Sequence, residues 1–196
     1  AFNETGDKVL SLSSDNHAIL WDVDGESNQT MAHEESIYEA IFATKTDMIL
    51  TCSSDGKARL WDPTHQEQSF VAHQNAVSGA LFSNKGYILS WSRGGNAKIW
   101  NTSGKELKQF NDFGNLAAVL NRQEDKILSW SSDGTIRLLD LDGNVLTTMK
   151  HTGPVWRAIF NQQENKILSW SQDGTAKLWS ITGEKLMEMS HERGVT

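Results

Sequence analysis

The sequence has few of the residues that stabilise or anchor a chain by means other than packing. Cys52 is its single cysteine, which excludes an intrachain disulfide and fits a reducing compartment. Only 2 prolines are present, and no apolar run approaches the ~18 residues that a membrane-spanning helix needs. Residues 1–4 carry neither a basic segment nor an apolar signal core. We therefore expect a cytoplasmic chain without a membrane segment.

Clustered positive charge is also missing. The chain has 18 Lys and Arg against 25 Asp and Glu, which gives a formal net charge of −7 and a pI near 5.3. Binding to a phosphate backbone or an anionic membrane surface needs clustered Lys and Arg. The composition therefore argues against nucleic acid or a membrane as the partner. Tryptophan, in contrast, is abundant at 8 residues.

Five segments of the chain repeat one pattern and account for most of the tryptophan. They read SLSSDNHAILWD, TCSSDGKARLWD, SWSRGGNAKIWN, SWSSDGTIRLLD and SWSQDGTAKLWS. The closing aromatic positions, 39 or 40 residues apart, are Trp21, Trp61, Trp100, Leu139 and Trp179. A fixed period along the whole chain is the signature of a repeat architecture. We therefore interpret residues 1–196 as a single array of about five repeats.

Each period contains four short stretches with strand character. In the last period these are residues 155–160, 166–170, 176–179 and 184–189. The second and third stretches are joined by a turn with Asp-Gly, the strongest short hairpin signal. No helical periodicity competes with this pattern, so the sequence predicts an all-β fold with four strands in each period.

The pattern resembles the WD40 family, whose repeats of about 40–45 residues close with a Trp-Asp pair. Trp21-Asp22 and Trp61-Asp62 keep the pair, and the other three periods keep one member or the other. The resemblance implies WD40-type β-propeller blades of four antiparallel strands, in about five repeats of 39–40 residues. The stretch KILSWSSDGT is similar to bacterial WD40 arrays, which favours a bacterial-type array.

Several periods contain a His, a Ser or Thr, an Asp and a Trp, a set that invites a hydrolase reading. An active site is normally built once, whereas this set recurs. In WD40 families such residues form a buried hydrogen-bonded tetrad, so the resemblance implies structural tetrads. The tetrad positions are His33, Thr51, Asp55, Trp61, His73, Ser90, Trp100, His151, Ser169, Asp173 and Trp179.

Two periods depart from the tetrad. In the third, Gly94 replaces the turn Asp, so we expect a softer blade there. In the fourth, Leu139 replaces the closing Trp, and the His position holds Asn111 or Asp112. Both ends of the hydrogen-bonded chain are lost together, as expected if each end needs the other.

In proteins similar to this one, partners often meet the face formed by two loop sets, between repeats and between the second and third strands of a repeat. The family positions on this face carry over to Ser36, Pro154, Tyr38, Ser78, Trp156, Ser54, Ser132, Gln172 and Arg93. We favour Tyr38 and Trp156, because exposed aromatic residues dominate interface hot spots. The alternative is that they pack against a neighbouring blade. Trp91, Trp130 and Trp170 are expected to fill the core between blades.

The sequence therefore predicts a non-catalytic scaffold or sensor module that binds other proteins or peptides, without cofactor or metal. One alternative is a self-assembling propeller, whose ring or stack is completed by other copies. An enzyme would need convergent titratable groups in one blade, which the sequence lacks. Both ends of the sequence fall within the same predicted strand. We therefore expect this sequence to be a section of a larger propeller or of a longer protein. Two alternatives for its assembly stay open, a homo-oligomer and an attached effector domain.

Overall fold

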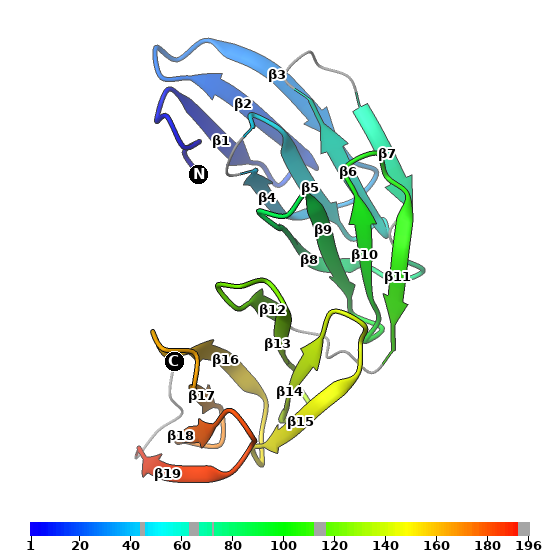
Figure 1. Cartoon of the computed structure of the whole chain (residues 1–196). Helices are drawn as coiled ribbons and strands as arrows, with labels where there is room; N and C mark the ends of the chain where they lie inside the picture. The colour runs from blue at the N-terminus through cyan, green and yellow to red at the C-terminus, as the bar shows by residue number, and fades with distance from the viewer. Residues whose placement is uncertain (44–45, 63–66, 72, 112–116, 192–196) are drawn as a thin grey trace. The chain divides into compact units, whose positions relative to one another are not determined.

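The computed structural model describes residues 1–43, 46–62, 67–71, 73–111 and 117–191. Within these ranges the chain is all-β and forms five antiparallel sheets, without a helix (Figure 1). The chain divides into two compact units, residues 1–109 and 110–196.

The first unit contains three sheets, whose strands follow one another in chain order. The first sheet contains β1 (Lys8–Leu12), β2 (His17–Asp22) and β3 (Ser27–Ala32). The second sheet contains β4 (Ile37–Phe42), β5 (Ile49–Ser53), β6 (Lys57–Trp61) and β7 (Glu67–Val71). The third sheet contains β8 (Val77–Phe82), β9 (Tyr87–Ser92), β10 (Ala97–Asn101) and β11 (Glu106–Phe110).

The second unit contains two four-stranded sheets of the same order. One consists of β12 (Ala117–Leu120), β13 (Lys126–Trp130), β14 (Thr135–Asp140) and β15 (Val145–Lys150). The other consists of β16 (Val155–Phe160), β17 (Lys166–Ser171), β18 (Thr175–Ser180) and β19 (Lys185–Ser190). The strands predicted for the last period are confirmed to within one residue at each end.

The prediction of four strands in every repeat is wrong for the first sheet, which has three. At the open edge of β1, Phe2 makes only an isolated bridge to Val9. The same pairing, between Phe160 and Ile167, lies at the end of a full strand ladder in the last sheet. One isolated bridge does not make a strand ladder, so the first sheet has three strands.

The core of each unit lies between consecutive sheets, because alternate side chains of a strand point to opposite faces. In the second unit, one sheet contributes Leu128, Trp130, Ile136, Leu138 and Met149, and the next contributes Val155, Ala158, Ile167 and Trp179. Residues at equivalent positions form two further clusters in the first unit. Cys52 belongs to one of these clusters, and burial raises the pKa of its thiol, so it is a packing residue.

The turns between the second and third strands of a sheet use glycine for a local reason. Gly56 has a φ of +78°, a conformation that other residues rarely adopt. A Cβ atom at this position would also lie 2.8 Å from the carbonyl oxygen of His73. The same oxygen-facing arrangement recurs at Gly134 beside His151. The Asp-Gly turns therefore hold the loop that carries the next histidine close to the sheet.

Candidate protein-binding face and the buried networks beneath it

In the first unit, His33 lies in the loop between β3 and β4 and joins two parts of the second sheet. Its Nδ1 lies 3.0 Å from Asp55 Oδ2, and its Nε2 lies 2.7 Å from Thr51 Oγ1. The indole N–H of Trp61 donates to the same hydroxyl oxygen over 3.0 Å. Because the carboxylate must accept the Nδ1 proton, the Thr51 hydroxyl donates to Nε2 and accepts from Trp61. The buried polar groups therefore satisfy one another.

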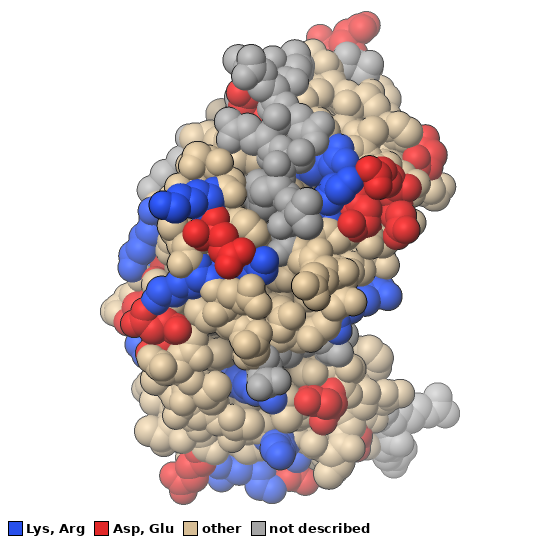
Figure 2. All heavy atoms as spheres, turned by 90° about the vertical axis from the view of Figure 1, so that its right-hand side faces the viewer, with Lys and Arg blue, Asp and Glu red and all other residues tan. Residues whose placement is uncertain are grey.

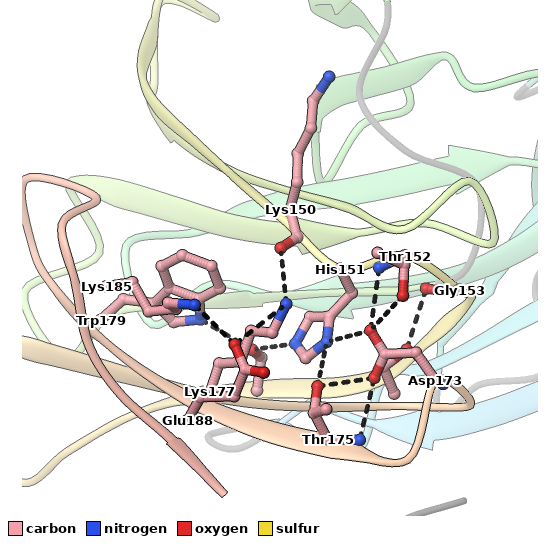
Figure 3. A network of polar contacts seen from close by, with 12 residues as sticks. Lys150, His151, Thr152, Gly153, Asp173, Thr175, Lys177, Trp179, Lys185 and Glu188 are labelled. Atoms are coloured by element: carbon pink, nitrogen blue, oxygen red, sulfur yellow. Dashed lines mark hydrogen bonds and ion pairs between the residues drawn. The ribbon is translucent and has the colours of Figure 1, made fainter. Parts of the chain in front are cut away.

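The second unit repeats this network in its last sheet (Figure 3). His151 Nδ1 lies 3.0 Å from Asp173 Oδ2, and Nε2 lies 2.8 Å from Ser169 Oγ. The indole of Trp179 donates to Ser169 Oγ over 2.9 Å. The network joins the β15–β16 loop to β17 and β18, so it ties one sheet to the next.

Asp173 is the most strongly stabilised anion of this network. Burial by itself would raise its pKa, but donors from Thr175, from the backbone of Thr152 and from His151 hold the pKa of this carboxyl well below its ordinary range. The Thr175 hydroxyl lies 2.7 Å away and the Thr152 N–H lies 2.9 Å away. Burial lowers the pKa of His151 despite the attraction of this carboxylate. The pair is therefore an ionised Asp and a neutral His near neutral pH.

The third repeat keeps only part of the network, as its sequence predicts. His73 Nε2 lies 3.0 Å from Ser90 Oγ, and Trp100 donates to the same oxygen over 2.9 Å. Gly94 supplies no turn carboxylate. Burial, followed by the positive charge of Lys98, lowers the pKa of His73 to about 4. His73 is therefore neutral near neutral pH, and it is held through Nε2 by its hydrogen bond with Ser90.

The first and fourth repeats depart further. Leu139 is buried where other repeats have Trp, and Asn111 is exposed in the loop where they have His. Asp112, the alternative His position, lies outside the described residues. In the first repeat, Trp21 donates to Ser11 Oγ over 2.8 Å. No histidine precedes this sheet in the sequence to complete that set.

The candidate protein-binding face begins at β-bulges in the first strands of three sheets. The register shifts within residues 37–39, 77–79 and 155–157. A bulge places two residues opposite one and re-aims a side chain. The residues at these bulges are Tyr38, Ser78 and Trp156. Tyr38 is 41% exposed and Trp156 is 49% exposed, whereas the hydroxyl of Ser78 is buried without a hydrogen-bond partner.

The other positions predicted for this face lie in loops that are hydrogen-bonded to each other. In three repeats, a backbone N–H in the turn between the second and third strands donates to a backbone carbonyl in the loop that follows the histidine. The pairs are Ser54 with Ser36 at 3.0 Å, Arg93 with Ala76 at 3.1 Å, and Gln172 with Pro154 at 2.9 Å. Ser132 is exposed at the matching place in the fourth repeat, where the loop at residues 112–116 lies outside the described part.

One contact joins two predicted face residues of adjacent sheets. The guanidinium carbon of Arg93 lies 4.9 Å from the centroid of the Tyr38 ring. This distance is within the range of a cation–π interaction. Both side chains remain exposed at the surface, so the pair forms a combined aromatic and cationic feature on the first unit.

Sequence reasoning missed two contacts beneath the face. The indole of Trp130 donates over 3.2 Å to the carbonyl of Trp156 and so fixes the backbone of the bulge. Glu39, next to Tyr38, accepts from the backbone N–H of Ala80 at 3.3 Å, and burial raises its pKa. A carboxylate within the otherwise apolar strand IYEAIF was the available signal. No sequence pattern could indicate the partner of Trp130, because this partner is a backbone carbonyl.

The described residues contain no group of three or more His, Cys, Asp and Glu side chains arranged to hold a metal ion. In the same residues, no helix has the length and apolar character needed to cross a membrane. Of the predicted core tryptophans, Trp91 and Trp130 are buried, whereas Trp170 is half-buried.

Comparison with solved structures shows a likeness of fold. The chain is similar to the crystal structure of the computationally designed Ika8 protein, with a TM-score of 0.86 and 24% sequence identity. The similarity covers 100% of this chain, which spans 62% of the length of that chain. No curated protein matches the sequence.

Comparison with protein families gives two matches. Residues 25–62 and 143–180 both match the WD40 family, described as WD domain, G-beta repeat. Each matched segment ends at the closing pair of a repeat, Trp61-Asp62 in one and Trp179-Ser180 in the other. These two segments are therefore similar to WD40 repeats.

Proposed function

We propose that the chain is a non-catalytic recognition module, made of β-propeller blades, whose loop face binds other proteins or peptides. WD40 repeats generally mediate protein interactions. The observation that carries the proposal is the exposure of Tyr38 and Trp156 at equivalent bulges. Because the bulge recurs, the same backbone feature presents a different side chain in each of these repeats.

The residues on this face have the chemistry of interface hot spots. Trp, Tyr and Arg are enriched among residues whose truncation weakens binding most. Tyr38 and Arg93 form one such feature in the first unit, and Trp156 forms another in the second. The backbone beneath Trp156 is held by Trp130, so this aromatic side chain stands on a rigid base. A partner that covers an aromatic ring gains its burial at little cost in ordering.

The recurring Ser or Thr, His and Asp sets support a structural reading over a hydrolytic one. A nucleophilic hydroxyl must reach its substrate, but Thr51 and Ser169 have no exposed surface. Each hydroxyl also accepts an indole N–H, so the oxygen that would attack is already engaged. These sets hold loops against sheets through hydrogen bonds, and we assign them no catalytic reaction.

The charge distribution favours a protein over a nucleic acid as the partner. On the face drawn in Figure 2, Lys and Arg lie among Asp and Glu, and neither sign gathers into one large patch. Within the described residues, several charged side chains form ion pairs, such as Lys98 with Glu106 at 2.9 Å and Lys185 with Glu188 at 2.6 Å. A phosphate backbone would need an excess of unpaired cations on one surface.

The proposal is tested with peptides selected from a random library for binding to the purified chain. Their affinities are then measured for Tyr38→Ala, Arg93→Ala and Trp156→Ala. Truncation of a hot-spot residue is expected to weaken binding by about tenfold or more. Leu107→Ala, an equally exposed residue on β11, is the control and should bind normally. Full affinity in all three face variants would show that the loop face is not the binding surface.

A further inference from the structure

In the second sheet, the Asp of the turn between the second and third strands is held by three N–H groups. Asp55 Oδ2 lies 3.0 Å from His33 Nδ1 and accepts from the backbone N–H of Glu34 at 3.3 Å. Asp55 Oδ1 accepts from the backbone N–H of Lys57 at 2.9 Å. Two donors from the loop and one from the turn therefore hold both oxygens of one carboxylate.

The last sheet holds its turn carboxylate in the same way (Figure 3). Asp173 Oδ2 lies 3.0 Å from His151 Nδ1 and accepts from the backbone N–H of Thr152 at 2.9 Å. The backbone N–H of Thr175 donates to Asp173 Oδ1 over 2.9 Å. Two separate repeats thus show that three donors in this arrangement fit a carboxylate.

The third repeat keeps the same three donors but has Gly94 where the other two repeats have Asp. The three donors of this repeat are His73 Nδ1, the backbone N–H of Gln74 and the backbone N–H of Asn96. Within the described residues, none of the three meets a hydrogen-bond acceptor. Donors without an acceptor gain free energy when an anion accepts from them.

The backbone of the third repeat brings loop and turn together as in the complete repeats. The N–H of His73 donates to Gly56 O over 3.0 Å, and the N–H of Gly95 donates to Ser92 O over 3.0 Å. Both hydrogen bonds recur at the matching positions of the second and last sheets. The three donors therefore stand in the same backbone frame, and the side chain between them is what differs.

The proton on the ring of His73 is available to such an anion. The histidine is only 6% exposed, and its Nε2 lies 3.0 Å from Ser90 Oγ. Trp100 donates to the same oxygen, so the Ser90 hydroxyl donates its own proton to Nε2, in the order found in the second sheet. The neutral imidazole then carries its proton on Nδ1. This is the ring atom that meets the Asp in the complete repeats.

The charge of this turn also favours an anion. Arg93 stands where the second repeat has Ser54 and the last has Gln172. The turn therefore lacks one negative charge and carries one more positive charge than its counterparts. Within the described part of the chain Arg93 forms no ion pair, and its guanidinium carbon lies 4.9 Å from the centroid of the exposed Tyr38 ring. A guanidinium group is well suited to bind a carboxylate.

The rim of the three donors is open to a partner. Gln74, Asn75 and Gly94 are all exposed. The side-chain amide of Asn75 lies so close to the backbone of Gly94 that it takes part of the place of an Asp side chain. Within the described residues this amide forms no hydrogen bond, so nothing fixes it there. It can turn aside or donate to an incoming anion.

We propose that the Gly94 turn binds a carboxylate of a partner peptide, in the place that Asp55 and Asp173 fill in their own repeats. The inference rests on the proposed function and deepens it, because it gives the bound peptide a required acidic group. The three donors hold the carboxylate, and Arg93 meets it at the rim. An Asp or Glu side chain and a peptide C-terminus share this chemistry.

Acetate tests the site without any peptide. It is titrated into the isotope-labelled 196-residue chain at neutral pH, against sodium chloride at equal ionic strength, and the backbone amides are followed by NMR. We expect saturable shifts at Gln74 and Asn96 with acetate alone. The amides of Glu34 and Lys57 are the internal control and should not respond, because Asp55 already accepts from them. No saturable shift at Gln74 and Asn96, or an equal shift with chloride, would overturn the proposal.

The double variant Asn75→Gly with Gly94→Asp supplies the carboxylate from the chain itself and should close the site. Acetate should no longer shift the amides of Gln74 and Asn96. Peptides selected on the wild-type chain should bind this variant at least about tenfold more weakly. Circular dichroism verifies that the variant is folded.

Chemical neutralisation of the peptide identifies which carboxylate binds. Each acidic side chain is replaced by its amide, and in a separate peptide the C-terminus is amidated. One of these changes should weaken binding to the wild type by about tenfold and leave binding to the double variant unchanged. Equal loss with both proteins would place that carboxylate elsewhere and contradict the proposal.

Failure of this inference is distinguishable from failure of the proposed function. Peptides that need Tyr38 or Trp156 but bind the wild type and the double variant equally would support the loop face and overturn the carboxylate site. Saturable acetate shifts at Gln74 and Asn96, with no peptide bound through the loop face, would support the carboxylate site and overturn the proposed function.

Discussion

The Arg93 guanidinium carbon lies 4.9 Å from the centroid of the Tyr38 ring, so a turn residue of one sheet covers a bulged residue of the sheet before it. The bulge turns Tyr38 outward, and the Arg93 backbone is fixed by its hydrogen bond to Ala76 at 3.1 Å. The contact joins two adjacent repeats at the surface that we propose binds partners. It also allows that surface to be examined without knowing the partner.

The first prediction concerns the energy of this contact. A double-mutant cycle with Tyr38→Ala and Arg93→Ala should give a coupling of about 0.5 to 1 kcal/mol, as expected for an exposed cation–π pair. The free energy of unfolding in urea is the measurement. A second cycle, in which Lys105→Ala replaces Arg93→Ala, should give no coupling, because Lys105 lies in a different turn. Equal coupling in the two cycles would show that the contact has no energetic role.

The second prediction concerns the buried network of the second sheet. Thr51→Ala removes the hydroxyl that Trp61 donates to and that His33 accepts from. Two buried polar groups lose their partner, so the free energy of unfolding should fall by about 2 to 4 kcal/mol. Thr51→Ser keeps the hydroxyl and should cost about 1 kcal/mol or less. If Thr51→Ala lowered the free energy of unfolding only slightly, the network would not be what holds the loop to the sheet.

The third prediction concerns pH. The pKa of His73 is about 4 in the folded chain, below the ordinary value of 6.5. Between these values the unfolded chain binds more protons, so acidification favours unfolding. The contribution of His73 is complete above pH 6.5 and is lost as the pH falls to about 4, with a size of about 3 kcal/mol. His73→Gln should flatten the fall in the free energy of unfolding over this range. An identical pH profile in the wild type and the variant would contradict the assignment.

The fourth prediction concerns repair of the third repeat. An added Cβ at Gly94 would collide with the side-chain amide of Asn75. The fifth repeat has Gly153 and Asp173 at these two places. The double variant Asn75→Gly with Gly94→Asp should therefore stabilise the chain by about 1 kcal/mol, because a carboxylate can then accept from His73. The pKa of His73, followed by NMR, should rise. Gly94→Asp alone should gain less, and a loss of stability in the double variant would refute the reasoning.

The repeat itself determined much of the fold and of the buried networks. A constant spacing separates His, hydroxyl, Asp and Trp within one hairpin and the loop before it, so local strand pairing brings them together. The departures at Gly94 and Leu139 were therefore readable from the sequence, and the network weakens at both places. The roles proposed for the loop face remain predictions. The pairing of Arg93 with Tyr38 was not readable, because it depends on how two sheets pack and not on spacing along one.

By itself, then, the sequence determined the strands, the turns and the positions that point to each face, since these follow from period and local hydrogen bonding. Only the tertiary structure decided which of those positions are covered. The identical KILSWS segments show the difference: Trp130 is buried and Trp170 is half-buried. Whether a side chain is buried depends on what packs against it, and the sequence of one strand does not specify which sheet lies opposite. For the same reason, the burial of Met149 and the exposure of its counterpart Met189 were visible only in the folded chain.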